Sequence, residues 1–324
     1  MNDIKSYICK NEQRLDIFLA SQIEQTRSQV AHLIKKKCVY VNEKVVARAG
    51  VKLKVDQVVR VEFPEVKVAK ALEIDFDVEI LYEDEDVLVI NKPTNLTVHP
   101  APSVKEATLV EWLKHKNIRL STISGEERHG IVHRLDKGTS GVMVVAKNNE
   151  AHTFLSEQLQ DKSMGRHYIA VIIPPLKEDI TIVNKPIKRS SNNRLKMGCE
   201  NGGKDAKTAF AFLAQSKDET MQLIACKLFT GRTHQIRVHL ETMSRHIIGD
   251  HLYGDTKKDD KSERILLHAY EIHFIHPRTK EIHKYEAPMD SYMNGYIQDK
   301  FNMRDINEVI NSSYITKCFT NTLS

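Results

Sequence analysis

The chain has 324 residues, of which 41% are hydrophobic and 28% charged, a balance typical of a globular protein with a substantial core. Its length predicts about two domains. No apolar run approaches the ~18 residues that a membrane helix needs, and the first residues lack the apolar segment of a secretory signal. We therefore expect no membrane partner and a cytoplasmic location.

Metal and disulfide chemistry are not indicated. The five cysteines are scattered and include no Cys-x-x-Cys pair. His234 and His239 lie five positions apart, unlike the i, i+4 histidine pair of a helical zinc site. We expect reduced thiols and no metal.

The net charge of +5 is placed unevenly. Residues 1–63 contain 12 Lys and Arg against 7 Asp and Glu, whereas residues 64–324 contain 36 of each. The whole excess lies in the first fifth of the chain, which indicates a polyanion-binding module there.

Two short helices are predicted in this basic segment. Leu15, Phe18 and Leu19 recur at helical spacing, and a second helix is expected to bury Val30, Leu33 and Ile34. A capping box, Thr26 to Gln29, predicts the start of the second helix. Residues 39–42 and 58–63 alternate in polarity as strands do.

Four basic residues are expected on the outer side of this helix pair: Arg27, Lys35, Lys36 and Lys37. Together they would offer phosphates a compact positive surface. The alternative is a solvated helix end, where lysines favour the negative end of the helix dipole.

The stretch His129–Gly141 is the centre of the remaining chain. It places Arg134 and Asp136 beside a Gly-Thr-Ser-Gly turn, and an apolar strand follows at 142–146. In a tight loop that packs against a sheet, the backbone would fix the direction in which the Asp136 carboxylate points. The alternative is an ordinary polar turn. His99, in an extended piece further upstream, receives no role.

A second cluster runs from Phe229 to Leu240. Thr233 is expected to cap a helix that buries Ile236 and Leu240. Arg237 could then reach back to an acidic side chain at the end of the sheet. Tyr168 lies in a further predicted strand, 167–172, where a tyrosine is most often a packed aromatic.

Two segments show little periodicity. Residues 185–207 look like a basic surface loop, either solvated or in contact with nucleic acid. After about Asp290, Asn, Ser and Thr become more frequent, so we expect a loosely packed extra helix or disorder.

The first 63 residues resemble the small RNA-binding domain of a small-subunit ribosomal protein. The matching pieces are Arg-Leu-Asp-x-x-Leu-Ala, Thr-Arg-Ser, Leu-Ile-Lys and Val-Tyr-Val-Asn. Lys37 and Glu43 stand where this module usually has glycine.

The rest resembles the RluA-type pseudouridine synthases. The matching stretches are 87–100, 130–147 with His-Arg-Leu-Asp and Thr-Ser-Gly, 166–171, 230–240, 249–254 and 267–277. Asn95 and Ser244 stand where glycine is common in this family.

The resemblance implies an α+β fold: a catalytic domain with a central mixed, mainly antiparallel sheet flanked by helices and loops, plus the small N-terminal α/β domain. The expected boundaries are 1–63 for the RNA-binding domain, 64–74 for a linker, 75–295 for the catalytic domain and 296–324 for a C-terminal tail. We expect a monomer.

The resemblance also implies the reaction: a uridine in RNA is detached at nitrogen, turned and rejoined through carbon. Asp136 would be the essential aspartate and Arg237 its ion-pair partner. Tyr168 would stack on the uracil and handle the proton at carbon 5. Arg134 would fill the space left by the flipped uridine, and Arg232 would contact RNA. A neighbouring guanidinium favours the ionised carboxylate that such chemistry requires.

No cofactor is required, because no redox step or group transfer occurs. The expected substrate is large-subunit ribosomal RNA, with transfer RNA as the alternative. A further alternative is an RNA-binding assembly factor that retains the fold but not the chemistry. The resemblance leaves open whether Asp136 attacks the ribose, adds to the base or drives elimination through a glycal.

Overall fold

The structure, a computed structural model, describes residues 4–23, 27–62, 73–101, 104–122, 129–254 and 262–320. The chain separates into two compact units, Met1–Ala71 and Leu72–Ser324. The expected linker, 64–74, lies outside the described residues except for its last two positions. No helix in the described part is both long enough and apolar enough to cross a membrane.

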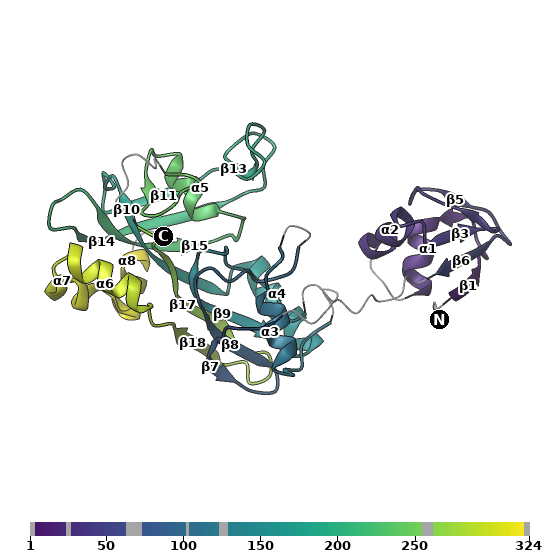
Figure 1. Cartoon of the computed structure of the whole chain (residues 1–324), viewed down its shortest axis with the longest axis horizontal. Helices are drawn as coiled ribbons and strands as arrows, with labels where there is room; N and C mark the ends of the chain where they lie inside the picture. Colours follow the sequence, from purple (N-terminus) through teal and green to yellow (C-terminus); the bar gives the residue numbers. More distant parts are fainter. Residues whose placement is uncertain are drawn as a thin grey trace. The chain divides into compact units, whose positions relative to one another are not determined.

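The N-terminal unit is a small α/β fold (Figure 1). Its antiparallel sheet has the order β1-β6-β3-β4, and a separate two-stranded sheet pairs β2 with β5. The elements are β1 (Ile4–Ile8), β2 (Gln13–Arg14), α1 (Leu15–Gln22), α2 (Arg27–Lys35), β3 (Val39–Val41), β4 (Lys44–Val45), β5 (Lys52–Leu53) and β6 (Val58–Glu62).

Both helices bury the faces that their apolar spacing predicts. Leu15, Phe18 and Leu19 of α1 lie in the same core as the apolar residues of α2 and of the sheet. The predicted strands at 39–42 and 58–63 correspond to β3 and β6. Thr26, the first residue of the predicted capping box, lies outside the described residues.

Four residues that stand at usual glycine positions adopt left-handed backbone conformations. Their φ angles are 61° for Lys37, 62° for Glu43, 60° for Asn95 and 58° for Ser244. For a residue with a Cβ atom this conformation costs about 1–2 kcal/mol. The turns have therefore kept the shape that glycine favours although the glycines are absent.

Ser244→Gly is expected to stabilise the protein by about 0.5–1 kcal/mol. The substitution removes the left-handed strain, and the greater freedom of glycine in the unfolded chain offsets part of the gain. Ser244 is exposed, so little packing is lost. Thermal unfolding measures the change. Ser244→Ala keeps a Cβ atom and should leave the melting temperature nearly unchanged; a lower melting temperature for the glycine variant would contradict the strain argument.

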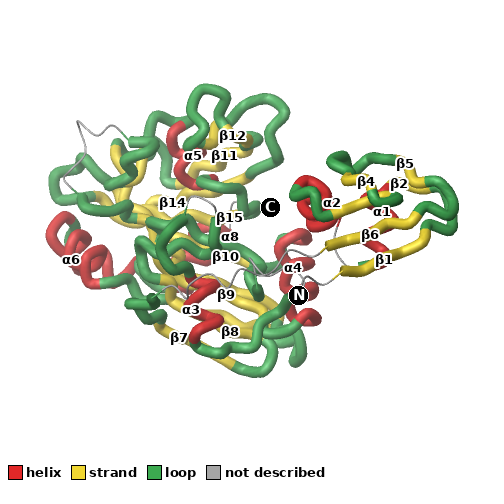
Figure 2. Tube along the Cα trace, turned by 45° about the vertical axis from the view of Figure 1, so that its right-hand side comes forward, coloured by secondary structure: helices red, strands yellow, loops and turns green. Residues whose placement is uncertain are grey.

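The larger unit is built on one ten-stranded sheet, whose strands are yellow in Figure 2. The order is β11-β14-β15-β10-β17-β9-β8-β7; in addition, β16 pairs with β10 and β18 pairs with β17. The strands are β7 (Glu79–Glu83), β8 (Val87–Lys92), β9 (Ser140–Ala146), β10 (Gly165–Ile173), β11 (Ile180–Asn184), β14 (Lys207–Gln215), β15 (Gln222–Leu228), β16 (His246–Ile247), β17 (Leu267–Ile275) and β18 (Ile282–Glu286). All pairs are antiparallel except β9 with β17. The expected α+β fold with a mixed, mainly antiparallel sheet is confirmed.

Gly141 allows β9 to approach β17 closely. A Cβ atom at this position would lie 2.2 Å from the carbonyl oxygen of Ala269, and the φ of Gly141 is +115°. Gly141 pairs with Ala269, which in turn pairs with Tyr168 of β10. The register therefore aligns the end of the His129–Gly141 loop with Tyr168 across a single intervening strand.

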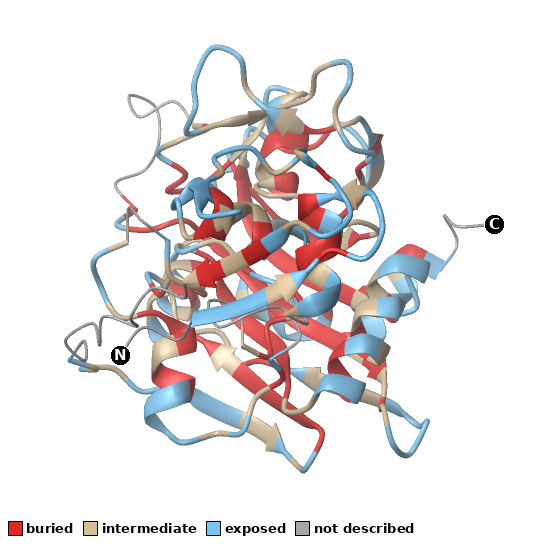
Figure 3. Ribbon diagram, turned by 90° about the vertical axis from the view of Figure 1, so that its right-hand side faces the viewer, coloured by how far each residue is buried: buried red, intermediate tan, exposed pale blue. Residues whose placement is uncertain are grey.

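The central strands are buried on both faces, as Figure 3 shows. Every residue of β9 is buried, which explains its continuous apolar sequence. The helices of this unit up to residue 241 are α3 (Leu109–His115), α4 (Asn149–Asp161) and α5 (Gln235–Glu241). The basic segment 185–207 contains a two-stranded ribbon of β12 (Lys188–Arg189) and β13 (Met197–Gly198), and Ile187 belongs to the same small buried cluster as Val238 of α5.

For the C-terminal segment the expected alternatives were a loosely packed extra helix or disorder. Its described part is helical, but it packs against the sheet rather than loosely. Residue 296 lies inside α6 (Ser291–Lys300), which is followed by α7 (Met303–Val309) and α8 (Ser312–Thr320). The last two helices pack on β14. Their buried side chains recur at helical spacing, Ile306 with Val309 and Ile315 with Phe319, among polar residues that obscured the pattern.

Candidate active site

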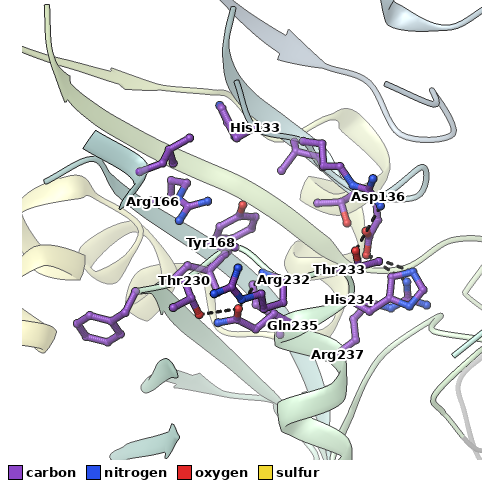
Figure 4. Close-up of a pocket in the computed structure, with 18 of the residues that line it drawn as sticks. His133, Asp136, Arg166, Tyr168, Thr230, Arg232, Thr233, His234, Gln235 and Arg237 are labelled. Atoms are coloured by element: carbon purple, nitrogen blue, oxygen red, sulfur yellow. Dashed lines mark hydrogen bonds and ion pairs between the residues drawn. The ribbon is translucent and has the colours of Figure 1, made fainter. Parts of the chain in front are cut away.

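A pocket of about 660 Å³ lies where three segments of the larger unit meet. One wall is the loop 131–136, another is strand β10, and the third is the segment 228–237 that leads into α5. Figure 4 shows Asp136, Tyr168 and Arg237 around this pocket. The structure thus brings together three residues of the predicted site, although the first and the last of them are about 100 positions apart in the sequence.

Asp136 is held in a tight turn. Its carbonyl oxygen accepts a hydrogen bond from the Thr139 amide at 3.0 Å, and its side chain is 21% exposed. Gly138 leaves room for this turn, because a Cβ atom there would lie 2.9 Å from Ile265. The carboxylate consequently faces the pocket from a rigid backbone.

A fully buried lysine supports the same loop. Lys92, at the end of β8, donates to the carbonyl oxygens of Pro93 at 2.8 Å, Leu96 at 2.9 Å and Lys137 at 3.3 Å. Burial lowers the pKa of Lys92 to about 7, although the charge of Asp136 opposes this shift. Lys92 lies in the matching stretch 87–100 but had no expected role, and it ties β8 to the residue next to Asp136.

Arg237 reaches Asp136 from α5. Its Nη1 donates to Oδ2 of Asp136 at 3.2 Å. Burial alone would lower the pKa of Arg237, but the hydrogen bonds and charge of Asp250 and the charge of Asp136 together raise it above its usual value. The guanidinium is therefore a permanent positive charge beside the Asp136 carboxylate.

Asp250 is the principal anchor of Arg237. Its carboxylate accepts from Nε and from Nη2 of Arg237, both at 2.7 Å, and it is fully buried. Its Oδ1 also accepts from the amides of Leu252 and Tyr253. Asp250 lies in the matching stretch 249–254, but no role was expected for it. No local pattern could have paired it with Arg237.

His234 completes the surroundings of the carboxylate. Its Nε2 lies 3.9 Å from Oδ2 of Asp136, and its Nδ1 lies 2.9 Å from the hydroxyl of Tyr253. Burial lowers the pKa of His234, although Asp136 opposes the shift. His234 has a φ of 57° and is the N-cap of α5. The prediction of Thr233 as the cap is therefore wrong: the chain turns one residue later, and the hydroxyl of Thr233 instead accepts from Arg134 at 3.4 Å.

Tyr168 is 95% buried in β10 and lines the pocket. Burial raises the pKa of Tyr168 to about 12; the nearby Arg166 opposes the shift and Asp136 adds to it. The phenol is therefore neutral at pH 7. Tyr168 offers an aromatic wall to anything held beside Asp136.

The two further arginines of the predicted site also line this pocket. Arg134 is exposed, and Arg232 is half-buried with its Nε donating to the carbonyl oxygen of Asp205 at 2.9 Å. His99, which received no role, also lines the pocket. Of the nine predicted site residues, five meet here: Arg134, Asp136, Tyr168, Arg232 and Arg237.

The other four belong to the N-terminal unit. Lys35, Lys36 and Lys37 are exposed at the end of α2. The guanidinium of Arg27 is 60% exposed and binds the buried carboxylate of Asp16 at 2.7 Å. Hydrogen bonds from Arg14 and from Arg27 hold the pKa of Asp16 below its usual value against the effect of burial. Arg27 therefore stabilises this unit and also presents positive charge at its surface.

Comparison with known proteins identifies the class to which this fold and site belong. The family described as RNA pseudouridylate synthase matches residues 86–242, and the S4 domain family matches residues 13–59. Among solved structures, human RNA pseudouridylate synthase domain containing 1 has a similar fold. Its TM-score is 0.58 at 21% identity, with 74% of this chain and 98% of that one covered.

Curated relatives extend over nearly the whole chain. An uncharacterized RNA pseudouridine synthase of Helicobacter pylori strain J99 is 46% identical over 314 residues, which cover 94% of this chain and 95% of that protein. The ribosomal large subunit pseudouridine synthase D of Zymomonas mobilis is 38% identical over 294 residues, with 86% and 91% covered. The chain belongs to the RNA pseudouridine synthase family and is of the RluA type with an N-terminal S4 domain. It is an isomerase that acts on RNA.

Proposed function

We propose that this enzyme converts specific uridines of large-subunit ribosomal RNA to pseudouridine, with Asp136 as its essential residue. The observation that carries the proposal is the chain of charges from Asp250 through Arg237 to Asp136 at a pocket walled by Tyr168. Relatives named as ribosomal large-subunit enzymes support the choice of RNA.

The proposed reaction breaks the bond from the ribose C1′ to N1 of the base and forms a bond from C1′ to C5. C5 then loses its proton, and N1 gains one. Whether Asp136 attacks C1′, adds to the base or removes a ribose proton, it must act as a carboxylate. Arg237 keeps a positive charge 3.2 Å from it, and Asp250 prevents that guanidinium from turning away.

Access to the uridine requires that the base leave the RNA stack, at a cost of a few kcal/mol. Arg134 is exposed and lines the pocket, so it is suited to occupy the space that the flipped nucleotide vacates. Tyr168 would pack its ring against the uracil, since stacking on an aromatic side chain contributes about 1–3 kcal/mol per base.

The target RNA can be tested directly. Pseudouridines are mapped in total RNA from cells with and without the protein, and purified enzyme is then added to the unmodified RNA. We expect sites that disappear from large-subunit ribosomal RNA without the protein and return on addition of enzyme. Sites in transfer RNA alone would refute the choice of RNA. No change in any RNA would favour a binding factor without catalysis.

Tyr168→Phe is expected to bind RNA normally and to form product about 10²–10⁴-fold more slowly. The ring that stacks is kept, whereas the hydroxyl that would relay the C5 proton is lost. Because the phenol is neutral at pH 7, it would accept the C5 proton only while it releases its own proton to water. Product formation under single-turnover conditions measures the effect. Tyr270→Phe, the same change at a tyrosine that donates to Glu286 outside the pocket, is the control. Wild-type turnover by Tyr168→Phe would exclude this role.

The S4 domain should supply much of the salt-dependent RNA affinity. Replacing Lys35, Lys36 and Lys37 by Gln is expected to lower the slope of log Kd against log salt by about 2, since each phosphate contact contributes about 0.7–0.9. Fluorescence titration of an RNA fragment between 50 and 200 mM salt, roughly the range over which such slopes are clear, measures it.

The matched control replaces three exposed lysines elsewhere on the same unit: Lys44, Lys52 and Lys54. It makes the same change in net charge. An equal slope for both triple variants would mean that only the overall charge matters and that the end of α2 makes no phosphate contact.

A further inference from the structure

Arg166 is a buried cation for which the described residues supply no ion-pair partner. It lies on β10 two residues before Tyr168, so both side chains point to the same face of the sheet. Only 7% of Arg166 is exposed. Among the residues that the structure describes, no carboxylate pairs with its guanidinium, and its buried Nε has no hydrogen-bond partner.

Such an arrangement is costly unless a ligand completes it, because a buried charge normally requires a counter-charge or hydrogen bonds. Arg166 lines the pocket that contains Asp136 and is drawn beside Tyr168 in Figure 4. Gly231 provides the space that the guanidinium occupies: a Cβ atom there would lie 2.8 Å from Nη1 of Arg166. Next to the proposed base-stacking residue, the pocket wall therefore presents a guanidinium whose buried Nε has no acceptor among the described residues.

His133, in the same pocket, carries a second donor, Nδ1, that has no acceptor among the described residues. Its Nε2 accepts from the Val144 amide at 3.1 Å, so the ring proton of the neutral form resides on Nδ1. Burial, followed by the charge of Arg166, lowers the pKa of His133 to about 3, and the ring is neutral at pH 7. Nδ1 is buried and has no hydrogen-bond partner in the described structure.

Arg166 and His133 are both buried, and this favours a base rather than a phosphate as the group that they bind. Phosphates of a flipped nucleotide remain with the RNA backbone outside the pocket. A base that enters the pocket brings acceptor oxygens to its buried wall. Uracil carries two carbonyl oxygens, O2 and O4, which match donors such as a guanidinium and an imidazole N–H.

We propose that Arg166 donates hydrogen bonds to a carbonyl oxygen of the uracil, with His133 as a second donor, and that these bonds are strongest while the base is detached from the ribose. This inference rests on the proposed function. When the C1′–N1 bond breaks, its electron pair stays with the base and spreads from N1 onto O2 and O4. A fixed cation at one of these oxygens stabilises that charge until C5 bonds to C1′. The same hydrogen bonds keep the detached base from leaving the pocket while the base rotates.

The test compares Arg166→Ala and Arg166→Lys with wild-type enzyme on unmodified large-subunit ribosomal RNA transcribed in vitro. Single-turnover rate constants at saturating enzyme and RNA dissociation constants are measured separately. For Arg166→Ala we expect a rate constant lower by about 10²–10³-fold, the usual effect of losing one such donor, with a Kd within threefold of wild type. Lysine keeps the charge but not the forked donors, so we expect a loss of about tenfold.

Added methylguanidinium should raise the single-turnover rate constant of Arg166→Ala at least tenfold, because it can occupy the vacated space with the same donors. A merely structural loss would not respond in this way. The control is Arg264→Ala, which removes a second buried guanidinium, one that pairs with Asp290 outside this pocket. We expect Arg264→Ala to be less stable and to keep its rate within threefold.

Wild-type rate constants for both Arg166 variants would overturn the assignment. A loss confined to Kd would also overturn it, because it would place Arg166 at a phosphate. If Arg166→Ala does not fold, the rate of Arg166→Lys decides, since that variant keeps a cation at the site. Pseudouridine formation by the wild-type enzyme tests the proposed function separately, so normal Arg166 variants would refute only this inference.

Discussion

Asp136→Asn is expected to form no measurable pseudouridine, a decrease on the order of 10⁴-fold or more in the single-turnover rate constant, while it binds RNA as tightly as the wild type. The amide has the shape of the carboxylate but can act neither as a nucleophile nor as a base. All three proposed forms of the mechanism require the charge, so the result does not depend on which one operates.

The variant should also fold normally. Arg237 keeps its two hydrogen bonds to Asp250 when Asp136 is neutral, and the side chain at position 136 is partly solvated. We therefore expect a free energy of unfolding within about 1 kcal/mol of wild type. Asp205→Asn removes an exposed negative charge from the same pocket lining and is the control for a general charge effect. Turnover by Asp136→Asn at the rate of Asp205→Asn would refute the assigned role.

Asp250→Asn is expected to reduce both activity and stability, although Asp250 is fully buried beneath the site. The carboxylate holds Arg237 in two hydrogen bonds of 2.7 Å. The substitution removes the negative charge and leaves the buried Arg237 guanidinium without its main counter-charge. We therefore expect a loss of about 3 kcal/mol in the free energy of unfolding. With its anchor weakened, Arg237 would no longer be fixed beside Asp136, and the rate constant should fall by about 10²-fold.

Denaturant unfolding and single-turnover kinetics separate the two effects. Asp290→Asn is the matched control, because Asp290 also binds an arginine, Arg264, but outside this pocket. It should lose stability and keep the rate constant. If Asp250→Asn lost stability to the same extent as Asp290→Asn but turned over at the wild-type rate, the positioning of Arg237 would not depend on Asp250.

The spacing of apolar residues correctly predicted those helices and strands whose buried faces are visible within a few consecutive residues. The apolar spacing of Leu15, Phe18 and Leu19 is enough to define a helix face, and the unbroken apolar run from Val142 to Ala146 is enough to define a buried strand. The pattern failed in the C-terminal segment, where Ile315 and Phe319 are separated by polar residues and their burial depends on the β14 surface beneath them.

The resemblance of whole stretches named the residues of the site, but it could not reveal how they are held. The Arg237 guanidinium meets a carboxylate 101 positions earlier in the chain and another 13 positions later, and no periodicity connects these distances. The same holds for Lys92, whose ammonium reaches the carbonyl oxygen of Lys137 from a different strand.

The sequence by itself thus determined that this chain has a basic S4 domain and an RluA-type catalytic domain with Asp136 in a tight loop. Only the tertiary structure decided that Asp250 anchors Arg237 and that Arg166 lies buried and unpaired among the described residues beside Tyr168. The physical reason is range. Helix and strand periodicities act over a few residues, whereas ion pairs and orphaned donors depend on which strands the sheet register brings side by side.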